Sequence, residues 1–135
     1  MILSVGIWEV KSPGYCKSTN TSETPSYFLE ELLNALQLIS GPSLYIIWKT
    51  HGRDYTENLV QGNVSLGLIN TAQNWFSTHA PSHMGLSDFG SAMKNGNRLF
   101  GQDRIMGDST SHFGADARTL SIQMASHLVY RKNEK

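Results

Sequence analysis

An amphipathic helix followed at once by an apolar strand is the feature that most constrains the fold. Apolar side chains recur at three- and four-residue intervals through residues 25–39, which predicts one apolar helical stripe. Thr24 is suited to cap this helix, and Gly41 predicts a left-handed stop at its end. Residues 43–50 then carry apolar side chains at consecutive positions, which indicates a strand buried on both faces. Such a helix–strand unit is typical of layered α/β domains.

Two further segments predict strands. Residues 2–11 are apolar on both faces and indicate a second central strand. Residues 119–131 alternate, with Leu120, Ile122, Met124, Leu128 and Tyr130 on one face, and predict a long, half-buried C-terminal strand. We therefore expect an α/β or α+β fold: a single layered domain with a mixed sheet and the helix 25–39 packed on it.

The middle of the chain gives weaker signals. Residues 63–76 fit a strand that passes into a helix near Asn70, and helix is favoured only for the second half. Residues 77–118 carry half of the glycines and predict an irregular segment. Within it, a short helix capped by Ser87 and a bent strand over residues 98–107 are expected.

Length and charge limit the classes of protein. The 135 residues are expected to form one domain, 1–135, with a polar tail at 132–135. Eleven basic and eleven acidic residues give a formal net charge of zero, so nucleic acid is an unlikely partner by charge. No apolar run is long enough for a membrane span, and the N-terminal segment lacks the basic start of a signal peptide. A soluble, cytoplasmic or otherwise intracellular protein is expected.

A polar turn after the second predicted strand is a candidate catalytic site. His51 and Asp54 follow the strand 43–50, where a general base could reach a substrate. Arg53 lies between them and could bind an anionic group. The alternative interpretation is an ordinary polar turn with a local Arg–Asp pair.

The polar segment 101–118 is a candidate ligand-binding loop. Its glycines could expose backbone N–H groups to an anion, and its arginines could bind one in bidentate fashion. The candidate ligand-binding residues are Arg104, Asp108, Ser109, His112 and Arg118. The spacing fits neither a P-loop nor a calcium-binding loop, so a surface loop is the alternative.

Two weaker constellations are a Cys–His pair and a His pair. Cys16, the one cysteine, and His51 both follow predicted strands and could meet as a thiolate and its base. His79 and His83 have metal-ligand spacing, but Pro81 between them argues against a shared helical face. No metal and no cofactor are predicted.

The sequence therefore predicts a small non-enzymatic binding or assembly protein. Its expected partners are itself, as a homo-oligomer, or a small anionic ligand or a protein, because the neutral charge favours association. The alternative is a small hydrolase or transferase that acts on an anionic substrate with His51 as general base.

Overall fold

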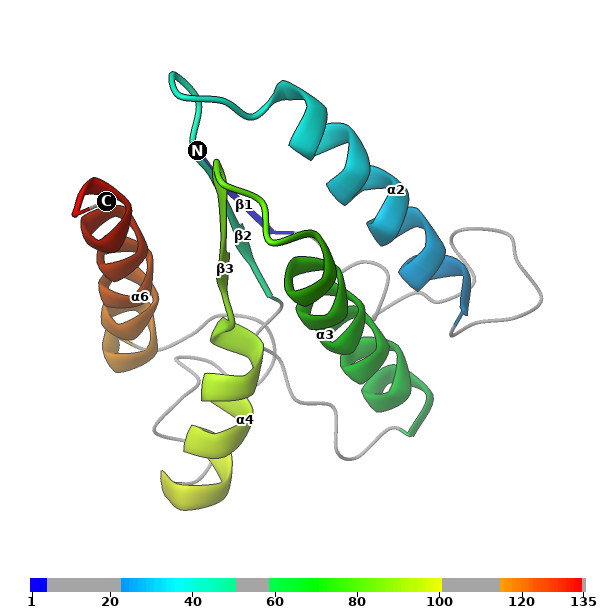
Figure 1. Ribbon diagram of the computed structural model, residues 1–135. Helices are drawn as coiled ribbons and strands as arrows, with labels where there is room; N and C mark the ends of the chain where they lie inside the picture. The colour runs from blue at the N-terminus through cyan, green and yellow to red at the C-terminus, as the bar shows by residue number, and fades with distance from the viewer. Residues whose placement is uncertain (5–22, 51–58, 101–114, 135) are drawn as a thin grey trace.

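The protein has a mixed α/β fold in a computed structural model that describes residues 1–4, 23–50, 59–100 and 115–134 (Figure 1). Within these ranges a parallel sheet has the strand order β1-β2-β3. The elements in chain order are β1 (Ile2–Leu3), α2 (Glu23–Ile39), β2 (Ile46–Lys49), α3 (Leu59–His79), β3 (Met84–Ser87), α4 (Phe89–Phe100) and α6 (Ala115–Asn133). The layered α/β prediction is confirmed at this level, with parallel pairing in place of the mixed sheet that the sequence suggested.

The helices form a layer on each face of the sheet. Helices α2 and α3 pack on one face, and α6 lies on the other, beside β3 (Figure 1). The main core lies under α2 and α3 and is built from Leu29, Leu33, Leu36, Ile46, Trp48, Val64, Leu68, Ala72, Trp75 and Met84. A smaller cluster of Phe89, Met93 and Ala117 joins α4 to α6.

Strand β2 is the centre of the sheet, as its apolar side chains predicted. Ile46 and Trp48 face the main core, whereas Ile47 and Lys49 line a groove beneath α6. This alternation follows from the two-residue period of a strand. The strand therefore separates a closed apolar face from a face that carries polar groups.

Helix α2 confirms the predicted helix. Its buried residues Leu29, Leu33 and Leu36 recur at helical spacing and face the core. Its end differs from the prediction, because Gly41 does not have a left-handed conformation. Instead, the Gly41 and Leu44 backbones exchange two hydrogen bonds and close a tight turn into β2.

The predicted C-terminal strand is wrong, since residues 119–131 lie within helix α6. Helix α6 packs Ala117 and Met124 against α4 and places Leu128 beside Gly85 of β3. Ile122 and Tyr130, which the alternation placed on the buried face, are exposed. Arg131 and Lys132 in the last turn favour a helix, because cations interact well with the negative end of the helix dipole.

The middle of the chain is more regular than predicted. The expected strand before Asn70 is wrong, because helix α3 covers that whole stretch and buries Val64, Leu68 and Ala72 as one stripe. Within 77–118, β3 and α4 are regular elements. Ser87 ends β3 and does not cap the helix, and residues 98–100 of the expected bent strand belong to α4. The rest of that expected strand lies outside the described residues.

Candidate functional site

Most residues of the predicted sites lie outside the part of the chain that the structure describes. This applies to Cys16, His51, Arg53, Asp54, Arg104, Asp108, Ser109 and His112. Arg118 is described: it is exposed on α6 and does not line the groove beneath that helix. The functional roles that the sequence assigns to all nine residues stay predictions.

The two histidines with metal-ligand spacing have separate surroundings. The His79 ring stacks on Trp75 with centroids 4.3 Å apart, and its Nδ1 lies 2.9 Å from the Trp75 carbonyl oxygen. His83 precedes β3, and its buried Nδ1 has no hydrogen-bond partner within the described ranges. Over those ranges no group of three or more His, Cys, Asp or Glu residues could hold a metal ion.

The carboxyl ends of β2 and β3 meet in a hydrogen-bond network. The Asp88 carboxylate accepts bonds from the Thr50 hydroxyl at 3.0 Å and from Gln73 Nε2 at 2.6 Å. Asp88 also accepts a long bond from the Ser91 amide and so caps α4, while the Gly90 amide donates to Thr50 Oγ1. These bonds join the end of β2 to α3 and to the start of α4.

Lys49 and Ser87 are the last residues of β2 and β3, and they lie on the face of the sheet that α6 covers. They are register partners in the β2–β3 pairing, so their side chains project side by side toward α6. Ser87 is only 2% exposed, and its Oγ has no hydrogen-bond partner in the described structure. An unpaired buried hydroxyl costs about 1–3 kcal/mol, which makes Ser87 a place where a ligand atom would gain a ready partner.

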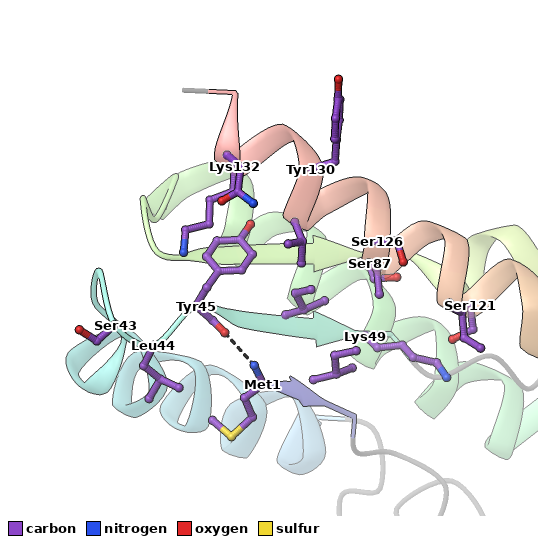
Figure 2. A pocket seen from close by; sticks show the side chains of 16 residues that line it. Met1, Ser43, Leu44, Tyr45, Lys49, Ser87, Ser121, Ser126, Tyr130 and Lys132 are labelled. Atoms are coloured by element: carbon purple, nitrogen blue, oxygen red, sulfur yellow. Dashed lines mark hydrogen bonds between the residues drawn. The ribbon is translucent and has the colours of Figure 1, made fainter.

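A groove of about 980 Å³ runs between α6 and the sheet and includes both residues (Figure 2). Its floor comes from β1 and β2, and its wall from one side of α6. Its lining includes the apolar residues Ile2, Ile47, Ile122 and Val129 and the polar residues Lys49 and Ser87. The volume falls within the range of small-molecule sites, which are mostly apolar with a few placed polar groups.

The cations that line the groove are two lysines and the amino group of Met1, which donates to the Tyr45 carbonyl oxygen at 2.9 Å. The Lys49 ammonium stacks 4.4 Å from the Phe89 ring centroid, and partial burial lowers the pKa of Lys49 through desolvation. The Lys132 ammonium lies 4.7 Å from the Tyr45 ring centroid at the other end of β2. Neither lysine pairs with a carboxylate of the described residues, and no described acidic residue lines the groove. An anion in the groove would therefore meet cations that no described acidic lining residue neutralises.

Gly85 gives the Tyr45 ring its place at the edge of the groove. A Cβ at Gly85 would collide with the Tyr45 hydroxyl, and Leu128 of α6 lies just beyond it. Burial raises the pKa of the Tyr45 phenol by desolvation, so this ring is a neutral part of the wall. The glycine lets the aromatic ring lie across β3.

Neither Lys49 nor Ser87 is among the site residues that the sequence predicts. Lys49 lies two residues before His51, at the end of the same predicted strand, and the sequence predicts Ser87 only as a helix cap. One feature could have indicated that they belong to a site: both residues end strands, and the carboxyl ends of parallel strands lie at one edge of the sheet, where ligands bind. That signal needed the β2–β3 pairing, which the sequence did not reveal.

Comparisons with known proteins return no match among protein-family models, curated proteins or solved structures. Within the described ranges, no helix combines the length and apolar character needed to cross a membrane. The site is therefore interpreted from its geometry alone.

Proposed function

We propose that the protein binds a small amphipathic anion in the groove between α6 and the sheet. The observation that carries the proposal is the pair Lys49 and Ser87 at the strand ends, one an ammonium without a described carboxylate partner and the other a buried, unpaired hydroxyl. The anionic group would accept hydrogen bonds from both side chains. The apolar body would lie over Ile47 and against Ile122.

The charge and shape of the groove support this class of ligand. Its apolar floor favours a hydrocarbon or aromatic body, because burying apolar surface contributes roughly 25 cal/mol per Å². Its cations favour a carboxylate or similar head group, because a hydrogen bond to a charged group contributes about 1.5–3 kcal/mol. The site residues of this proposal differ from those that the sequence suggested, but the small anionic ligand is the same class.

The test is binding of 8-anilinonaphthalene-1-sulfonate, followed by its fluorescence and displaced by decanoate or by decanol. Lys49→Met is expected to weaken decanoate binding about ten-fold, since 1.4 kcal/mol corresponds to a factor of ten. Decanol binding is expected to change little. Arg118→Met, which removes an exposed positive charge of α6 away from the groove, serves as the matched control. Equal losses in both variants, or none in either, would contradict the proposal.

Self-association is a second candidate function, favoured by the outer face of α2. Tyr27, Phe28, Leu38 and Ile39 are exposed there, Leu38 to 87%. A second copy is a suitable partner because a chain with zero formal net charge does not repel itself. Light scattering tests this: a dimer that Leu38→Ser dissociates supports it, and a monomer at all concentrations excludes it. The hydrolase or transferase alternative, with His51 as base, stays a prediction.

A further inference from the structure

We infer that the ligand of the groove carries an anionic group at each end of an extended apolar chain. The inference rests on the proposed function and deepens it by defining the ligand class. It follows from the positions of two lysines, one at each end of β2, with an apolar surface between them (Figure 2).

Each end of the groove holds a lysine over an aromatic ring, and the Ser87 hydroxyl lies at the Lys49 end alone. At one end, the Lys49 ammonium lies over the Phe89 ring, next to the Ser87 hydroxyl in register. At the other end, the Lys132 ammonium lies over the Tyr45 ring. Each ring positions its lysine through a cation–π contact, which leaves the ammonium hydrogens free to donate to an anion. Polar anchors at both ends favour a ligand with two charged ends.

The strand between the ends gives a minimum length for the ligand, because the Lys49 side chain extends beyond the end of β2 (Figure 2). Tyr45 and Lys49 are four residues apart along the extended chain. At roughly 3.3 Å per residue, this separation is about 13 Å. A fully extended chain advances at most about 3.6 Å per three backbone bonds, so a hydrocarbon of about eleven bonds covers this span. An α,ω-dicarboxylate of that length would place one carboxylate near each lysine.

The surface between the ends accepts a hydrocarbon. Ile2 and Ile47 are register partners on β1 and β2 and form the floor. Ile122 and Val129 line the groove from α6 and are exposed to solvent. These two α6 residues are seven apart, about two helical turns, so they lie on the same side of the helix. Figure 2 shows that α6 runs antiparallel to β2, with Lys132 near Tyr45 and Ser121 near Lys49. A methylene chain would cover these apolar groups along its length.

The experiment compares dodecanedioate with its monomethyl ester by calorimetric titration of the full chain. The two probes share a chain length and differ by one negative charge. The dicarboxylate is expected to bind about three-fold more tightly than the monoester. Lys132→Met is expected to remove that difference, whereas Arg131→Met, which alters the neighbouring exposed cation, is expected to preserve it.

The outcomes separate this inference from the proposed function. If both probes bind equally, and Lys49→Met weakens both, then the single-anion site stands and the two-anion inference is wrong. If Lys132→Met weakens the monoester as much as the dicarboxylate, the lysine supports the groove generally and the inference is also wrong. If neither probe binds the folded protein, both the inference and the proposed function are wrong. A shorter dicarboxylate, octanedioate, should lose the three-fold advantage.

Discussion

Lys49 and Ser87 are direct register partners on adjacent parallel strands, and both side chains line the groove beneath α6. The lysine has a lowered pKa, and the serine hydroxyl is buried without a partner among the described residues. Both conditions cost folding free energy in the unliganded protein. Residues that destabilise the fold at a strand end are expected where a ligand binds, because activity and stability often conflict.

Ser87→Ala should stabilise the unliganded protein while weakening decanoate binding. The change removes a buried, unpaired hydroxyl, so the free energy of unfolding should rise by about 1 kcal/mol. Urea denaturation measures it. Ser65→Ala is the matched control, because Ser65 is also buried but has an interaction partner, and its loss should be destabilising. A destabilised Ser87→Ala variant would mean that the hydroxyl has a structural role.

Lys49→Met should relieve a pH-dependent penalty. Because burial lowers the pKa of Lys49 from its ordinary 10.5, the unfolded chain binds more protons between the two pKa values. Wild-type stability should therefore rise with pH through that window, and the penalty is complete below the folded pKa. The stability gain of Lys49→Met should be largest at neutral pH and vanish above pH 10.5. A gain that is independent of pH would point to packing instead of charge.

Asp88→Ala should destabilise the fold by about 2 kcal/mol. The carboxylate caps α4 and accepts bonds from Thr50 and Gln73, and loss of a cap alone costs about 1 kcal/mol. Asp88→Asn keeps one acceptor oxygen and should lose less. Thermal denaturation measures both, and equal stability of all three proteins would show that the network contributes nothing.

Ala80→Gly should stabilise the end of α3. Ala80 has a φ of 40°, and its amide donates to the Phe76 carbonyl after the last helical turn. The left-handed conformation costs a non-glycine residue about 1–2 kcal/mol, and glycine avoids this cost. Glycine offsets part of that gain, because it loses more conformational entropy on folding than alanine does. We expect a net gain of about 0.5 kcal/mol. Ala35→Gly, at an exposed interior position of α2, should instead lose about 1 kcal/mol.

The sequence predicted the helix α2 and the central strand β2 because each has one dominant local signal. In α2, Leu29, Leu33 and Leu36 repeat at helical spacing, and in β2 the apolar run fits burial on both faces. The C-terminal prediction failed because apolar residues in α6 alternate over a short stretch by chance. Ile122 and Tyr130 are exposed in the helix, so the apolar residues of this segment do not mark its buried face.

The candidate site could be predicted only in part. The layered fold predicts polar site residues at strand ends, and the prediction for His51 follows from that rule. The pairing of Lys49 with Ser87 joins residues 38 apart in sequence and depends on β3, which lay in the segment expected to be irregular. The groove also needs residues 115–133 to form helix α6, whereas the alternating apolar residues of 119–131 predicted a strand.

The most direct test of the account is a decanoate titration followed by amide chemical shifts in nuclear magnetic resonance. The account predicts saturable shifts at Lys49, Ser87 and Ile122, which line the groove, with none at Leu38 and Ile39 on the exposed face of α2. Lys49→Met should raise the decanoate concentration at half-saturation of these shifts about ten-fold. Shifts confined to Leu38 and Ile39, or shifts at the groove that persist unchanged in Lys49→Met, would contradict it.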